Sequence, residues 1–316
     1  MATSGEGSSV PVVELTPTQQ RTLDALRLVG DPPEFDADDI AEIADEMRAT
    51  LADVAARLDP DSTLFVSKHR IGSVLDCEEF HLVDRGFEWT PANAAGTIAH
   101  RAIQLTLNWR GEVVPADLVD EAMTRLADEA RGIGEWIDGL SPADDADTRG
   151  HAINRVTGFL SDFPPLSRRW HPMTETSIRW PVAGPIVLSG KVDLVFGRPE
   201  GRRSRKVVID LKTGRPSLRH RQDLGFYALV ETLIRSVPPR RVATFYLDAG
   251  EAQVEDVGIP FLRSALRRTV DGIHALVEVE LERRPPIRRP GVACRWCPLA
   301  DDCDDGTAWL AAADTY

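Results

Sequence analysis

Two acids and a lysine occur on two stretches of the chain that have the pattern of neighbouring strands. The segment 190–214, GKVDLVFGRPEGRRSRKVVIDLKTG, has alternating runs on either side of a loop rich in Gly and Arg, which predicts a hairpin. Asp210 and Lys212 share one face of the second run, because side chains two residues apart point the same way. Asp193 is the only acid of the first run, where an unpaired charge would be costly. Two carboxylates and a lysine on adjacent strands indicate a divalent-metal site.

A histidine on an earlier helix is a further candidate. Thr90 followed by Pro91 predicts a helix start, since Thr caps helices well and Pro fits the first helical position. Gly96 and His100 then lie on one side of that helix. A lone histidine on an apolar helix face is more often a core residue than a ligand, so this pattern alone leaves both interpretations open.

The chain has four cysteines, Cys77, Cys294, Cys297 and Cys303. In a cytosolic chain this number points away from disulfides and toward a metal or a cluster. Zinc sites usually use paired, closely spaced cysteines, whereas here one cysteine stands 217 residues before a C-x2-C-x5-C group. The spacing favours a 4Fe-4S cluster, with zinc and free thiols as the alternatives.

The charge is unevenly distributed. The net charge is -13, yet residues 1–150 carry -18, residues 151–300 carry +10 and residues 301–316 carry -5. Basic residues surround the acid–lysine strand: Arg202, Arg203, Arg205, Lys206, Arg215, Arg219 and Arg221. A phosphate backbone could therefore be held there despite the acidic total, although a solvated surface is the simpler interpretation of any single arginine.

The surrounding elements predict an α/β domain with a mixed central sheet. Helical patterns cover 16–58 and 114–162, the second interrupted by a polar link at 141–150. A strand at 174–182, the hairpin, a helix from 218, two more strands and a long helix from 261 follow. Residues 1–12 have a disordered composition, and we expect a soluble, cytoplasmic protein, since the chain has neither a long apolar run nor a signal peptide.

Taken together, these segments resemble the PD-(D/E)XK nuclease superfamily and, within it, the RecB-like branch with an iron-sulfur cluster, which includes AddB-type and CRISPR-associated exonucleases. The likeness is carried by GTIAHRAI at 96–103, GKVDLV at 190–195, VVIDLKTG at 207–214 and the split cysteine frame. It implies a restriction-endonuclease-like core. The domain would cover 64–304 with a helical insertion at 114–162, between an acidic helical region at 13–63 and an acidic tail at 305–316.

The resemblance also implies roles for individual residues. The ligands of Mg²⁺ or Mn²⁺ would be His100, Asp193, Asp210 and the backbone carbonyl of Leu211, with Lys212 orienting the attacking water. The four cysteines would hold the 4Fe-4S cluster. Residues facing DNA would be Arg215, Arg219, Arg221, Gln222 and Tyr227. Glu175 matches an acid often found on the preceding strand, and Asp223 departs from the branch, which usually has Gln there.

These observations predict a metal-dependent DNA exonuclease that acts on single strands or DNA ends in repair, recombination or defence. The chain has no helicase motif, so unwinding would need a helicase or recombination partner. One alternative is a non-catalytic module on the same fold that holds DNA or a helicase. Another is a globular protein with a structural zinc site, in which Asp210 and Lys212 form an ordinary ion pair.

Overall fold

The computed structural model describes residues 14–83, 87–129, 132–281 and 283–313. The disordered lead expected at 1–12 lies outside these ranges. At the centre is a six-stranded mixed sheet in the order β1-β3-β4-β5-β6, with β2 on the other edge of β3. The strands are β1 Leu64–Val66, β2 Met173–Ala183, β3 Ile186–Phe196, β4 Val207–Lys212, β5 Arg241–Tyr246 and β6 Glu251–Asp256. The predicted α/β class with a mixed sheet is confirmed.

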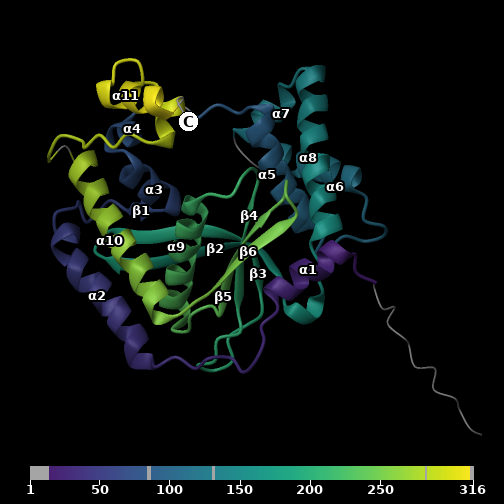
Figure 1. Cartoon of the computed structure of the whole chain (residues 1–316), viewed down its shortest axis with the longest axis horizontal. Helices are drawn as coiled ribbons and strands as arrows, with labels where there is room; N and C mark the ends of the chain where they lie inside the picture. The colour runs from purple at the N-terminus through teal and green to yellow at the C-terminus, as the bar shows by residue number, and fades with distance from the viewer. Residues whose placement is uncertain (1–13, 84–86, 130–131, 282, 314–316) are drawn as a thin grey trace, which may run out of the picture.

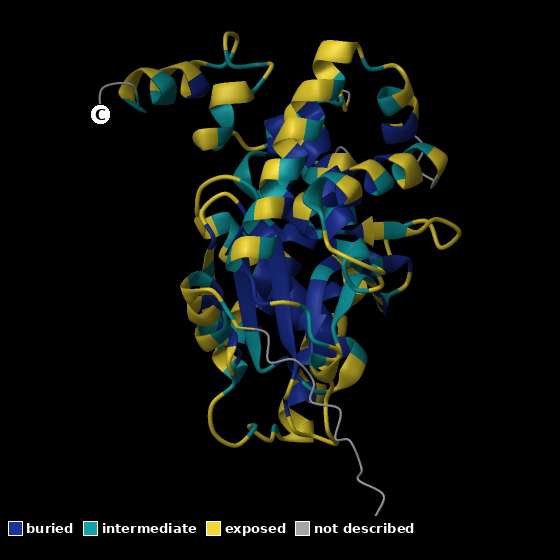
Figure 2. Ribbon diagram, turned by 90° about the vertical axis from the view of Figure 1, so that its right-hand side faces the viewer, coloured by how far each residue is buried: buried dark blue, intermediate teal, exposed yellow. Residues whose placement is uncertain are grey.

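The predicted hairpin is the centre of this sheet. β3 and β4 pair antiparallel with Leu194 opposite Ile209, whereas β4 and β5 run parallel. Every residue of β4 except Lys212 is buried, because helices cover both of its faces. Figure 2 shows the strands as the buried centre of the molecule and the exposed residues on the outer helices.

One face of the sheet is covered by helices from both ends of the chain (Figure 1). They are α2 Ala37–Ala55, α3 Lys68–Asp76, α9 Leu218–Arg235 and α10 Ile259–Glu280. The apolar stripe predicted for α2 is buried in this core: Ile40, Ile43, Met47, Leu51 and Val54. The N-terminal helical region therefore packs on the same core as the sheet, because its stripe recurs every three or four residues.

The opposite face packs against α1 Pro17–Leu26 and α8 Pro142–Asp162. Beyond them, α5 Pro91–Leu105 and α6 Pro115–Glu129 pack on α8 in a separate apolar cluster. In the described residues this cluster includes Ile98 and Ala99 of α5, on the helix that carries His100. The helical insertion therefore packs against α5, the helix that carries the candidate metal ligand His100.

The polar link predicted at 141–150 is wrong, because this stretch is the first half of α8. The Ser141 side chain accepts a hydrogen bond from the Asp144 amide at 3.2 Å, and Pro142 takes the first helical position. Asp144 and Asp145 lie in the first turn, where acids are favoured by the helix dipole. A polar composition that suggested a linker is in fact a well-capped helix start.

Shorter helices complete the described chain. They are α4 Glu78–Leu82, α7 Ile133–Asp138, the 3-10 turns Arg168–Trp170 and Val292–Trp296, and α11 Asp304–Ala313, which takes up most of the acidic tail. In the described part of the chain, no helix is both long and apolar enough to span a bilayer.

Candidate active site

The hairpin brings its predicted polar residues together. Asp193 of β3 and Asp210 of β4 lie on neighbouring strands, and the Leu211 amide donates a hydrogen bond to Asp193 Oδ2 at 2.7 Å. Asp210 is almost fully buried at 1% exposure, and Lys212 Nζ lies 3.0 Å from its Oδ2. The sequence pattern therefore predicted the proximity of these groups correctly.

His100 joins Asp193 from α5. Its Nδ1 lies 3.4 Å from Asp193 Oδ1 and 3.8 Å from Glu175 Oε1. In the described residues, one ligand atom from each of these three side chains lies within 4.8 Å of the others. Two carboxylates and an imidazole so close together form a donor set that suits a divalent cation. Asp210 is not in this set, although Lys212 and the Leu211 amide connect it to the same site.

Glu175 reaches the set through an unusual backbone conformation. Thr174 pairs with Leu194 and Thr176 with Val192, so Glu175 stands opposite Asp193. Its φ of 51° is in the left-handed region, which L-residues rarely adopt. Such strain persists only where the surrounding structure enforces it, and it is concentrated at functional sites. Glu175 was noted in the sequence only through the family resemblance, because strand alternation cannot show a local inversion.

The two acids strongly perturb His100. Burial by itself lowers the pKa of an imidazole, but the carboxylates of Asp193 and Glu175 outweigh it and raise the pKa of His100 to about 10. Without a metal the ring therefore carries a proton that offsets the acids, while Lys191 pairs with Glu175 at 2.6 Å. Positive charge near Asp193 and Glu175 offsets the repulsion between their carboxylates.

A second lysine, Lys68, contacts Asp210, and sequence reasoning missed it. Lys68 Nζ from α3 lies 2.8 Å from Asp210 Oδ1, 3.6 Å from Asp223 Oδ2 and 4.4 Å from the ring centroid of Tyr227. Burial lowers its pKa, but the two carboxylates outweigh that effect and raise it above its ordinary value. The sequence offered one signal for this contact. A lysine in the first turn of a helix is disfavoured by the helix dipole and is therefore expected to have an acidic partner.

Asp223, the departure from the expected Gln, belongs to the same cluster. Its Oδ2 lies 3.2 Å from Lys212 Nζ, so Lys68 and Lys212 stand between two buried acids, Asp210 and Asp223. Burial raises the pKa of Asp210, but the two lysines hold it below its ordinary range. Asp210 Oδ2 is a buried atom whose partner is the Lys212 ammonium at 3.0 Å.

The residues predicted to face DNA fall into three groups. Arg219 and Arg221 pair with Asp76 at 3.0 Å and Glu255 at 2.6 Å. Arg215 and Gln222 are exposed and have no ion pair or side-chain hydrogen bond among the described residues. Tyr227 is 3% exposed, and its hydroxyl donates to the Lys191 carbonyl at 2.5 Å. It lines the active-site cavity, and its contact with DNA stays a prediction.

The site opens into a cavity of about 750 Å³. It is lined by His100, Glu175, Asp193, Asp210, Lys212, Lys68, Lys191 and residues of α5 and the hairpin. The chain has 37 basic residues but only four lysines, and three of these four line this cavity. Carboxylates that can bind a cation and ammonium groups that can bind an anion therefore line the same cavity.

The four cysteines also lie together. Cys77, Cys294, Cys297 and Cys303 all line one smaller cavity of about 100 Å³ between α4 and the C-terminal turns. Among the described residues, no three of these sulfurs lie within 4.8 Å of one another, in contrast to the ligand atoms of His100, Glu175 and Asp193. Two sulfurs accept hydrogen bonds from backbone amides: Gly291 donates to Cys294 at 3.4 Å and Gly306 to Cys303 at 3.3 Å.

Of the comparisons with known proteins, the one with protein families bears on this site. A family model described as the PD-(D/E)XK nuclease superfamily matches residues 67–304. No curated protein matches the chain. A solved structure from Eubacterium rectale, of a protein proposed to be an exonuclease, has 11% sequence identity and a TM-score of 0.45, covering 75% of this chain and 87% of its own. At this TM-score the structural likeness adds no argument, so the family assignment rests on the family model.

Proposed function

This chain belongs to the PD-(D/E)XK nuclease superfamily, and we propose that it is a DNA exonuclease that hydrolyses phosphodiester bonds with Mg²⁺ or Mn²⁺. One observation carries the proposal. The His100, Glu175 and Asp193 set opens into the same cavity as Asp210 and Lys212. Ligands for a cation thus lie beside a positive charge for a phosphate.

The residues fit a divalent cation. The donor set is two carboxylates and one imidazole, and the Asp210 carboxylate offers further hard oxygens in the same cavity. We propose His100, Glu175, Asp193 and Asp210 as ligands, with the Leu211 carbonyl as an additional oxygen. When bound, the ion would lower the pKa of a water molecule and offset charge on the phosphate. Oxygen ligands suit magnesium, and the imidazole extends the range to manganese.

The chain's own residues supply positioning and charge. In hydrolysis a water oxygen bonds to phosphorus, the bond to the leaving oxygen breaks, and one proton of the water ends on that oxygen, which departs as a hydroxyl group. Lys212 reaches the cavity at 19% side-chain exposure, so its ammonium can contact a phosphate oxygen and orient the water. Lys68 is buried behind Asp210 and holds that carboxylate in place and ionised.

We also propose that the four cysteines hold a 4Fe-4S cluster, as in the RecB-like and AddB-like branch. All four line one cavity, and two already accept amide hydrogen bonds of the kind that tune cluster thiolates. A tetrahedral zinc site with Zn–S bonds of about 2.3 Å places sulfurs roughly 3.8 Å apart. The separation along the chain, with one cysteine 217 residues before the other three, is the observation that favours the cluster over zinc. The cluster would join α4 to the C-terminal turns.

The proposed substrate is single-stranded DNA or a DNA end. Arg215 and Gln222 are free to meet a phosphate backbone, which cationic and polar side chains hold without regard to sequence. Arg219 and Arg221 could do so only by exchanging their acidic partners. Any unwinding would come from a helicase or recombination partner.

A cleavage assay tests the function. End-labelled single- and double-stranded oligonucleotides are incubated with the protein and Mg²⁺, Mn²⁺ or EDTA. We expect metal-dependent release of short products and a loss of at least about 100-fold in Lys212→Ala and Asp193→Asn. The matched control is Arg267→Ala, which removes an exposed cation on α10. DNA binding without cleavage by the wild-type protein would overturn the proposal and support a non-catalytic module instead.

A further inference from the structure

The active-site cavity continues along α5 into a second, smaller cavity. The second cavity has a volume of about 190 Å³, and its lining includes Arg101, Gln104, Asn108, Trp109 and Arg125. Arg101 and Gln104 also line the active-site cavity, and the Arg101 guanidinium donates a hydrogen bond to Gln104 Oε1 at 2.6 Å. The two cavities therefore meet at this pair of side chains, and together they form the α5 groove.

The outer face of α5 gives the α5 groove a polar wall. Thr97, Arg101, Gln104 and Asn108 recur every three or four residues, and Thr97 and Asn108 are exposed. Asn108 lies just beyond α5, where its amide donates to the Leu105 carbonyl at 3.2 Å and so continues the helical turn. The stretch from His100 to Asn108 spans about 12 Å at 1.5 Å per residue. That length accommodates about three nucleotides stacked roughly 3.4 Å apart.

The α5 groove lies on an unusually acid-free part of the chain. The protein has 50 acids in 316 residues, yet residues 89–111 contain none. Arg125 of α6 contributes a cation to the second cavity, where no acid is among the described lining residues. Its Nε donates to Glu121 at 2.7 Å, but an exposed ion pair of this kind is weak and easily exchanged. A phosphate backbone would therefore be attracted here, whereas the acidic surface of the remaining N-terminal half would repel it.

Trp109 provides an aromatic surface at the C-terminal end of α5. Its Nε1 donates to the Glu112 carbonyl at 3.0 Å, and the side chain packs at the edge of the apolar cluster shared by α5 and α6. These contacts hold the ring in place, yet the residue is only half-buried. Within the described part of the chain, no other ring and no cation stacks on the indole. The ring can therefore receive a nucleobase, and such stacking is tolerant of base sequence.

We propose that the α5 groove holds a single strand of DNA leading out of the active site, with a base stacked on Trp109 and a backbone phosphate at Arg125. This inference rests on the proposed nuclease function and names the path of its substrate. Because Arg101 and Gln104 line both cavities, a strand with its scissile phosphate at Lys212 can follow α5 without leaving the groove. A duplex would first have to unpair a base to stack it on the indole, at a cost in free energy, so the groove favours single strands.

Fluorescence anisotropy without added divalent metal tests this path with two labelled probes of equal length and charge. One probe is a short oligo(dT) strand, and the other is an abasic strand that has no bases to stack. Trp109→Leu should weaken binding of oligo(dT) at least about fivefold, the lower limit for one stacked base, and leave binding of the abasic strand unchanged. Trp109→Phe keeps an aromatic ring and should bind oligo(dT) within about twofold of the wild-type protein.

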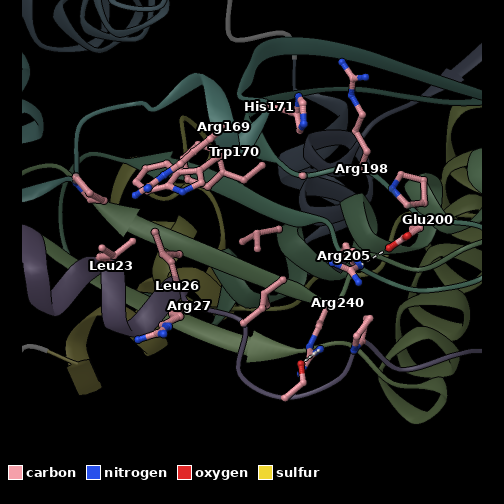
Figure 3. A pocket seen from close by; sticks show the side chains of 18 residues that line it. Leu23, Leu26, Arg27, Arg169, Trp170, His171, Arg198, Glu200, Arg205 and Arg240 are labelled. Carbon is pink, nitrogen blue, oxygen red and sulfur yellow. Dashed lines mark hydrogen bonds and ion pairs between the residues drawn. The ribbon is translucent and has the colours of Figure 1, made fainter. Parts of the chain in front are cut away.

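Arg125→Ala tests the phosphate contact. It should weaken binding of both probes and reduce the slope of log affinity against log salt concentration by about 0.7, the value for one phosphate contact to a single strand. The matched control is Arg198→Ala. Arg198 is exposed at a separate cavity of about 570 Å³, where Figure 3 shows Arg198 and Arg27 on opposite sides. This control should leave both affinities and the salt dependence unchanged.

Three results would overturn the proposed path. They are equal weakening of both probes by Trp109→Leu, which indicates a structural role, no effect of Trp109→Leu on either probe, and no binding of oligo(dT) by about 100 µM wild-type protein, the weak end of non-specific affinities. The nuclease function fails separately, because the anisotropy measurement includes no cleavage step. A protein that binds as expected without cleaving contradicts the nuclease function alone, and one that cleaves while Trp109→Leu binds like the wild type contradicts the path alone.

Discussion

Replacing Lys68 by methionine tests the four-residue ion cluster at the base of the active site. At 2.8 Å from Asp210, the ammonium contributes an attraction of about 6 kcal/mol at an effective dielectric constant of about 20. Desolvation cancels much of this attraction, yet without Lys68 two buried acids, Asp210 and Asp223, share the single ammonium of Lys212. One buried negative charge is then uncompensated, which costs about 3–5 kcal/mol. We expect Lys68→Met to lower the free energy of unfolding by that amount.

The measurement is urea denaturation in EDTA, followed by far-UV circular dichroism. The matched control is Lys206→Met, which breaks another buried pair, Lys206 with Glu231 at 2.7 Å, outside the active-site cavity. Both variants should lose comparable stability. Only Lys68→Met should also lose cleavage activity when assayed below its unfolding transition, because Lys68 holds a proposed ligand in place.

A double variant makes the reasoning refutable. Lys68→Met with Asp223→Asn removes one charge of each sign and leaves Asp210 paired with Lys212. We therefore expect the double variant to be more stable than the sum of the two single effects predicts, by about 0.5–3 kcal/mol. Strictly additive losses, or a Lys68→Met protein within 1 kcal/mol of the wild type, would refute the coupling described here.

Two further predictions concern stability. Burial raises the pKa of Glu280, but hydrogen bonds from His81 and Arg70 outweigh this effect and lower the pKa. The ionised carboxylate therefore stabilises the folded protein above the unfolded-state pKa of 4.5, and this stabilisation is lost as the pH falls through the lower folded-state pKa. Glu280→Gln should thus be about 1 kcal/mol less stable at pH 7 in urea titrations, and the gap should narrow below pH 4.5; a constant gap would contradict this. Gly197→Ala should lower the free energy of unfolding by more than the about 1–3 kcal/mol expected for backbone strain alone, since its φ is 78° and its Cβ would lie 2.3 Å from a carbonyl oxygen. Gly201→Ala, with a φ of 58° and nothing within 4 Å of the added Cβ, should lower it clearly less. Equal losses of stability would disprove the steric argument.

Much of the fold follows from local patterns in the chain. Alternation placed Asp210 and Lys212 on one face of a strand, because the side-chain period of a strand is two whatever its surroundings. The stripe from Ile40 to Val54 predicted the buried face of α2 for the same kind of reason. The link at 141–150 was misjudged because polar composition outweighed the capping signal of Ser141 and Pro142.

The candidate site depended more on tertiary structure. The sequence by itself determined which side chains of the hairpin share a face, and the cysteine spacing indicated a common site. Only the folded chain placed Lys68 against Asp210, 142 residues away, inverted the backbone at Glu175 and paired Arg219 with Asp76. The direction in which a side chain points is set by the local backbone period. The partner that neutralises its charge is set by how distant elements pack, and no local pattern records that choice.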